Sequence, residues 1–117
     1  MNLKIHKVKD SSIAELVADN NAINNVQDAV DLIGNASYLG AHKVVIYKNQ
    51  LNPDFFELKT QLAGEILQKF SNYRVKLAII GDFTKITRKS LRDFIKESNK
   101  NKHILFIASL EEALLKL

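Results

Sequence analysis

The fold is decided by residues 52–82, which read NPDFFELKTQLAGEILQKFSNYRVKLAIIGD. Asn52 and Pro53 are typical of a helix start, because asparagine caps free N–H groups and proline suits the first helical position. The apolar residues that follow recur at helical spacing, which predicts one amphipathic helix from Pro53 to about residue 72. The apolar run 75–80 has the length of a strand. This segment therefore predicts a long helix that runs into a buried strand.

Strands and helices alternate through the rest of the chain. The predicted strands are 3–9, 13–18, 43–47, 75–80 and 104–107, and the predicted helices are about 25–40, 53–72, 89–99 and 110–115. Helical connections between strands imply right-handed crossovers and a parallel sheet. We therefore predict an α/β fold of order β-β-α-β-α-β-α-β-α, with a mainly parallel five-stranded sheet covered by helices. An N-terminal hairpin should place the first strand antiparallel, at or near an edge.

The composition restricts the class of protein. At 117 residues the chain forms one domain with a real hydrophobic core. It has no cysteine, which excludes disulfides, thiolate zinc sites and cysteine nucleophiles. No run reaches the roughly 18 apolar residues of a membrane span, and the N-terminus lacks the apolar core of a secretion signal. A cytoplasmic protein without membrane contact is the simplest expectation.

Positive charge is concentrated near the C-terminal third. The net charge is +4, yet residues 84–103 contain seven lysines and arginines against two acidic residues. Readers of RNA or DNA usually add exposed aromatic residues or a recognised motif, and neither is present among these charges, because Phe94 falls on the apolar side of the predicted helix. We expect a solvated basic helix face, with an acidic protein partner as the alternative and nucleic acid not favoured.

Lys59 is the unusual residue of the predicted long helix. On a helical wheel it projects from the centre of the apolar arc, and burial of an unpaired ammonium group is costly. It should therefore extend past the helix end or meet a carboxylate, with Asp82 as first choice and Asp54 as second. A structural salt bridge and a binding or catalytic lysine both stay open, since burial and a nearby aspartate shift a lysine pKa in opposite directions.

The predicted site lies where the parallel strands end, because open α/β sheets bind ligands at that edge. The predicted binding residues are Asp54, Phe55, Phe56, Lys59 and Asp82. We expect this surface to take a small anionic ligand or a protein partner. The competing hypothesis is a small enzyme that uses Lys59 and Asp82 as an acid–base pair, although no complete catalytic signature is present.

No cofactor or metal is predicted. The three histidines, His6, His42 and His103, fall on separate elements without metal-ligand spacing. Carboxylates at Asp19, Asp54 and Asp82 could converge on magnesium, but capping explains such positions equally well. The apolar arc of the predicted long helix is wider than one sheet face requires, and its surplus edge, Phe55-Leu58-Leu62, could pack inside the chain or form a homodimer.

The sequence closely resembles a family of short bacterial proteins known as domain of unknown function 4180. The resemblance is carried by residues 24–29, 52–60, 62–74, 81–83 and 90–99. The element order and the C-terminal run 105–114 also look like the STAS domains of anti-sigma-factor antagonists, which implies a STAS-like, partner-binding regulatory fold. In that family a serine at the start of the second helix is phosphorylated, whereas the corresponding turn 52–56 has no hydroxyl here.

Overall fold

A computed structural model describes all residues, 1–117. The strands are β1 (Leu3–Val8), β2 (Ser11–Leu16), β3 (Lys43–Tyr47), β4 (Lys76–Ile80) and β5 (Ile104–Ile107). The helices are α1 (Val26–Tyr38), α2 (Leu62–Asn72), α3 (Lys89–Asn101) and α4 (Leu110–Lys116). Three short 3₁₀ turns, η1 (Lys48–Gln50), η2 (Pro53–Phe56) and η3 (Leu58–Thr60), separate β3 from α2.

The five strands form one sheet in the order β1-β2-β3-β4-β5. β1 pairs antiparallel with β2, and every later pair is parallel. The predicted α/β class, the element order and the antiparallel edge strand are therefore confirmed. Because each strand from β2 onward runs the same way, the loops after β2, β3 and β4 all emerge at one edge of the sheet.

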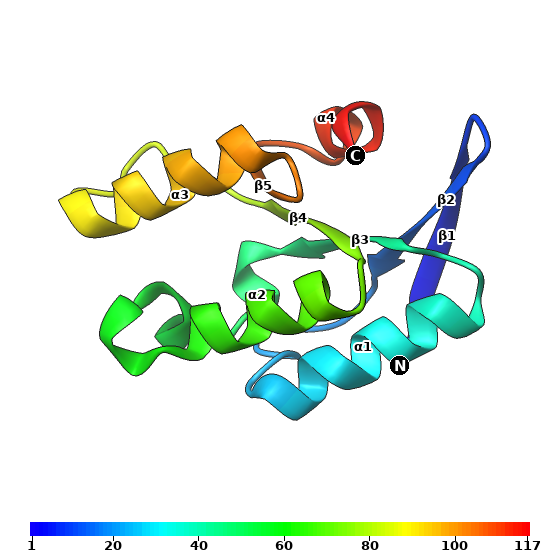
Figure 1. Ribbon diagram of the computed structural model, residues 1–117, viewed down its shortest axis with the longest axis horizontal. Helices are drawn as coiled ribbons and strands as arrows, with labels where there is room; N and C mark the ends of the chain where they lie inside the picture. The colour runs from blue at the N-terminus through cyan, green and yellow to red at the C-terminus, as the bar shows by residue number, and fades with distance from the viewer.

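Helices cover the two faces of the sheet unequally. A cluster of 23 buried residues lies between one face and the helices α1, α2 and α3. A smaller cluster of seven buried residues packs the other face against α4. In Figure 1, α1 and α2 lie on one side of the sheet and α4 on the other. α4 is a single short helix that contacts β1, β4 and β5, so the second face has less helical cover than the first.

Polar side chains cap two of the helices. The Asp28 N–H donates to the Asn25 side chain at 2.8 Å, so Asn25 is the cap of α1. The Glu112 N–H donates to the Ser109 hydroxyl at 3.2 Å at the start of α4. Both caps satisfy N–H groups that have no partner inside the helix. Asn25 and Ser109 therefore mark where α1 and α4 begin.

The prediction of one helix over 53–72 was wrong in its first half. Asn52 and Pro53 do start a helical turn, but η2 and η3 are separate turns and α2 begins only at Leu62. The Thr60 hydroxyl lies within hydrogen-bond distance of the carbonyl oxygens of Asp54 (2.7 Å) and Glu57 (2.8 Å). Such local bonds compete with helical ones.

Gln61 completes the interruption. Its φ of 64° is in the left-handed region, which no residue of an α-helix adopts. The Thr60 hydroxyl also accepts a hydrogen bond from the Leu62 N–H at 3.3 Å. The segment 53–61 is therefore a strap of two tight turns, and its side chains point in other directions than a wheel predicts.

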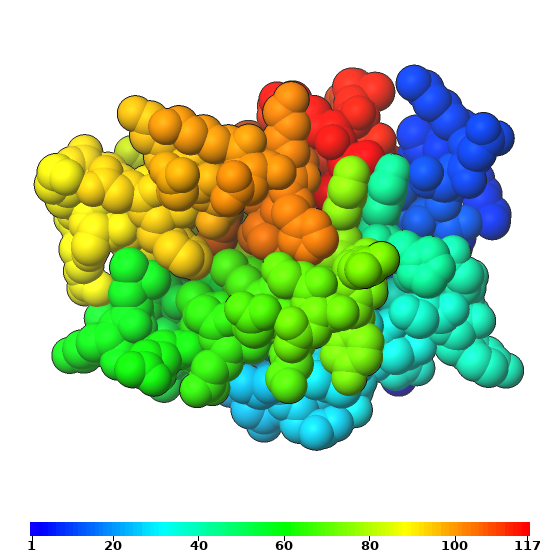
Figure 2. Space-filling model, viewed as in Figure 1, coloured from blue at the N-terminus to red at the C-terminus, as the bar shows by residue number.

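The helices are short. None is long and apolar enough to cross a membrane. In the space-filling view the strap and α2 lie directly beside α3 (Figure 2). Segments far apart in the sequence therefore lie next to each other on this side of the protein.

Candidate functional site

A crevice of about 650 Å³ opens at the carboxyl ends of β2, β3 and β4. Its walls come from the loops that follow these three strands and from the strap. It is lined by Asn20, Asn21, Tyr47, Lys48, Asn49, Leu51, Pro53, Phe56, Ile80, Gly81 and Asp82. The volume is in the range of small-molecule sites, and the position is the usual ligand edge of parallel sheets.

Backbone hydrogen bonds hold the loops after β2 and β3 together. The Asn21 N–H donates to the Asn49 carbonyl at 2.9 Å, and the Ile23 N–H donates to the Gln50 carbonyl at 2.8 Å. Ile23 and Leu51 then form a parallel bridge beyond the strands. One wall of the crevice therefore continues the backbone hydrogen bonding of the sheet beyond β2 and β3.

Gln50 is the one buried polar residue of the core, with 5% of its surface exposed. Its side chain accepts a hydrogen bond from the Tyr47 N–H at 2.9 Å. It also donates to the carbonyls of Leu16 and Ala18, both at 3.1 Å. These contacts satisfy backbone groups that burial would otherwise leave unpaired, and they fix how the chain leaves β3.

Lys48 extends over two aromatic rings at the rim of the crevice. Its ammonium nitrogen lies 5.7 Å from the centre of the Phe56 ring and 5.3 Å from that of Phe83. It donates to the backbone carbonyl of Asp82 at 3.2 Å, and none of the three ion pairs of the chain includes it. Cation–π attraction and one carbonyl therefore position a charge that no carboxylate neutralises.

Gly81 makes room for this lysine. A Cβ atom at position 81 would lie 2.7 Å from the Cβ of Lys48, closer than real contacts allow. The glycine is therefore required by close approach of two loops and not by an unusual φ. Any larger residue would therefore force one of the two loops to shift.

The Asp82 carboxylate is hydrogen-bonded to a residue of its own loop. It accepts hydrogen bonds from the Thr84 hydroxyl at 2.6 Å and from the Thr84 N–H at 3.0 Å. These bonds, hydroxyl first, lower the pKa of Asp82, with a smaller contribution from the charge of Lys48. Asp82 therefore stays ionised and shapes the turn into α3.

The predicted site residues do not all come together. Phe56 and Asp82 line the crevice, as expected from their positions after the strands. Phe55 is buried in the core with 1% of its surface exposed. Asp54 and Lys59 are exposed and do not line the crevice. Whether Phe56 and Asp82 bind a ligand stays a prediction.

The placement of Lys59 in an apolar arc was wrong. Lys59 lies in η3, is exposed and forms no ion pair with Asp82 or Asp54. The physical reason is the break at Thr60 and Gln61, which rotates Lys59 away from the face that α2 buries. The proposed acid–base pair of Lys59 and Asp82 is therefore not assembled.

The structure also shows where the candidate magnesium ligands and the predicted apolar edge lie. Asp19, Asp54 and Asp82 do not converge, since no group of three metal-ligating side chains exists. Phe55 packs in the core, and Leu58 and Leu62 pack partly buried against it. These residues are therefore used inside the chain, and self-association of the protein stays a prediction.

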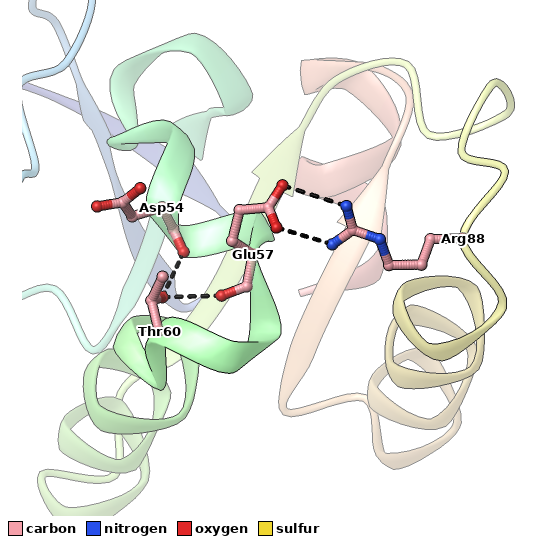
Figure 3. Close-up of polar contacts among 4 residues, drawn as sticks. All are labelled: Asp54, Glu57, Thr60 and Arg88. Carbon is pink, nitrogen blue, oxygen red and sulfur yellow. Dashed lines mark hydrogen bonds and ion pairs between the residues drawn. The ribbon is translucent and has the colours of Figure 1, made fainter.

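The strap is tied to the start of α3 by an ion pair. Arg88 donates to both carboxylate oxygens of Glu57, at 2.9 and 3.2 Å. Figure 3 shows this paired contact, with the Asp54 carboxylate turned away from it. The Arg88 hydrogen bonds, and then its charge, lower the pKa of Glu57. The contact joins the two segments that carry Phe56 and Phe83.

A second polar cluster joins β1, β2 and β3. The Tyr47 hydroxyl donates to Glu15 at 2.6 Å, and His6 Nε2 lies 2.8 Å from the other Glu15 oxygen. Burial alone would raise the pKa of Glu15, but the hydrogen bonds from Tyr47 and His6 and the nearby charges lower it. Burial and the bond to Glu15 raise the pKa of Tyr47 to about 12. Tyr47 is thus a fixed donor beside the crevice.

Sequence reasoning missed Lys48 and Phe83. A signal for Lys48 was present, because it follows the strand 43–47 directly and therefore lies at the same edge as Asp82. Nothing in the local sequence indicates that Phe83 contributes a ring to it, since that contact depends on how two distant loops pack.

Comparison with known families identifies the group to which the chain belongs. Residues 8–117 match the family described as Domain of unknown function (DUF4180), and the chain is a member of it. No curated protein and no solved structure matches the chain. The resemblance to that family is therefore confirmed, and the STAS-like arrangement stays a prediction.

Proposed function

We propose that this member of the DUF4180 family binds a small anionic ligand in the crevice after β2, β3 and β4, with Lys48 as its charged contact. The observation that carries the proposal is the Lys48 ammonium at the crevice rim, which is positioned by two rings and paired with no carboxylate. A charge held in this way attracts an anion more effectively than one already neutralised.

The rest of the crevice supports a ligand with a polar end and an apolar body. The Asn49 amide donates to the Asn20 side-chain oxygen at 2.8 Å, so the Asn20 NH₂ group has no partner and can donate to a ligand. Phe56, Leu51 and Ile80 supply the apolar surface. The crevice is open and not enclosed, so a bound ligand would keep one side in contact with water.

The anion must approach Lys48 from the side away from Asp82. The Asp82 carboxylate also lines the crevice and would repel a second negative charge. Its two hydrogen bonds from Thr84 fix its position, so the repulsion has a fixed direction. This arrangement favours a single carboxylate or phosphate group over a ligand with several charges.

Titration of the ¹⁵N-labelled protein with benzoate and with inorganic phosphate tests the proposal. We expect saturable chemical-shift changes at Gly81, Asn49 and the Asn20 side-chain NH₂, with benzoate binding more tightly because its ring reaches Phe56. Lys48→Gln should weaken binding at least about tenfold, the loss of one charge-assisted contact. Gly81→Ala should weaken it as well, since it forces one of the two loops to shift.

Lys59→Gln is the matched control. It removes the same charge from an exposed residue outside the crevice and should leave binding unchanged. Equal affinity in Lys48→Gln and Lys59→Gln would show that anions bind through general surface charge, and the proposal would fail.

A further inference from the structure

The free edge of β5 is closed by a side chain. β5 is the last strand of the sheet, so one side of it has no neighbouring strand. The backbone groups of His103 and Ile107 bond to β4, which directs those of Phe106 outward. The Asn99 side chain accepts from the Phe106 N–H at 2.7 Å and donates to the Phe106 carbonyl at 3.2 Å.

These are the two hydrogen bonds that a neighbouring strand would make. A side-chain amide has the same donor and acceptor as a peptide group, so Asn99 replaces one residue of a sixth strand. Unpaired strand edges invite pairing with another chain, and proteins block them with charges or with covering groups. Asn99 is such a covering group for Phe106.

The two edges of the sheet differ in this respect. The opposite edge strand, β1, contains Lys4 and Lys7 and is followed by Lys9, so charge protects it. β5 reads ILFI and has no charge of its own. An apolar strand without charge is the kind that pairs readily with a copy of itself. The protection of β5 therefore depends on Asn99.

Space for a further strand exists beside β5. A hollow of about 600 Å³ lies along it, and its charged lining residues are Lys102, Lys116 and Glu112, next to Asn99. A surface that carries both signs of charge can face its own copy across a two-fold axis, with lysine opposite glutamate. The occupant that fits best is thus a second copy of this chain.

We propose that the β5 edge is a strand-pairing surface that Asn99 keeps closed, and that a second copy of the chain pairs there, antiparallel, when Asn99 is removed. The proposal is independent of the crevice, because β5 and Asn99 do not line it. It also differs from the apolar helix edge Phe55-Leu58-Leu62, which was the sequence-based expectation for a dimer.

Sedimentation velocity of Asn99→Ala against the wild type, over a range of concentrations, tests the proposal. We expect the dissociation constant of the dimer to fall at least about tenfold in Asn99→Ala. Asn101→Ala, which removes an exposed amide from the same helix, should behave as the wild type. If Asn99→Ala does not fold by circular dichroism, Asn99→Ser gives the same truncation with a polar side chain.

Two further measurements locate the contact. Hydrogen exchange of the Phe106 amide should be slow in the wild type at every concentration and, in Asn99→Ala, slow only when the protein is concentrated. Adding Ala108→Lys, which charges an exposed position at the end of β5, should reverse the association. Unchanged association in Asn99→Ala and Asn99→Ser, or association that survives Ala108→Lys, would overturn the proposal.

Discussion

The two faces of the sheet are stabilised in different ways. Under α1, α2 and α3 the face is apolar throughout, and its cluster of 23 residues includes large buried side chains such as Phe55 and Phe70. On the other face the buried cluster has only seven residues, one of them Ala113 of α4, and Glu15 joins His6 and Tyr47 by hydrogen bonds. The first face therefore supplies most of the apolar burial, and the second keeps polar groups at its surface, next to the crevice.

The largest expected effect is at the first face. Phe70→Ala should lower the free energy of unfolding by about 3–5 kcal/mol, because the ring is 99% buried and its loss leaves a cavity. Leu105→Ala, a smaller truncation under α4, should cost about 2–3 kcal/mol, since it removes fewer atoms and fewer buried neighbours surround it. Urea denaturation measures both. A larger loss for Leu105→Ala would reverse the comparison of the faces.

Gln50 tests whether a buried polar group can matter as much as an apolar one. Gln50→Ala should cost about 1–3 kcal/mol, because the Tyr47 N–H and the carbonyls of Leu16 and Ala18 lose their partner. Urea denaturation measures the change, and Asn49→Ala, at an exposed neighbour, is the control. A stability equal to that of Asn49→Ala would mean that water replaces the Gln50 amide without cost.

Tyr47 makes the stability of the second face depend on pH in the alkaline range. Its pKa is raised to about 12 in the folded protein from 10.0, so the hydrogen bond to Glu15 stabilises the fold below pH 10 and is lost as the pH rises to about 12. Tyr47→Phe should cost about 0.5–1.5 kcal/mol at neutral pH. Tyr47→Phe should also remove the part of the stability loss between pH 10 and about 12 that comes from Tyr47 ionisation. Thermal melts across this pH range measure that loss.

An ultraviolet titration gives an independent check of Tyr47. The difference between the wild type and Tyr47→Phe should show one phenol that ionises near pH 12. Ionisation of that phenol near pH 10 would mean that Glu15 does not hold it, and the polar cluster would then contribute little to this face.

How much the sequence predicts depends on whether the relevant contacts are local. The strands β3 and β4 are visible because β-branched and apolar runs dictate them, and α2 is visible from Leu62 onward by its spacing. The strap was wrongly predicted as the first half of a long helix. The apolar spacing is helical, but the Thr60 hydroxyl bonds to backbone carbonyls and Gln61 adopts a left-handed conformation, and both interrupt the helix. Hydrophobic periodicity does not register either feature.

The candidate site was predicted in position and not in detail. Topology alone places the loops after the strands at one edge, which is why Phe56 and Asp82 line the crevice. Lys59, the predicted lysine, does not line the crevice, whereas Lys48 does, because Lys48 is positioned by rings from two other loops and by the missing side chain at Gly81. Such a contact arises only when the tertiary structure is formed.

The smallest expected effect concerns the exposed ion pair between Glu57 and Arg88 on the first face. Surface pairs contribute little because water and salt screen them, so Glu57→Gln and Arg88→Met should each change stability less than Tyr47→Phe does. Pairing lowers the pKa of Glu57, so its small contribution is present above the ordinary carboxyl pKa of 4.5 and is lost as the pH falls through the lowered value. At high salt, the change in unfolding free energy of the double variant should equal the sum of the changes in the two single variants, because screening removes the coupling. If Glu57→Gln instead destabilised the protein as much as Gln50→Ala, the strap would depend on this ion pair more than on the burial of Phe55, and apolar packing would no longer explain the stability of the first face.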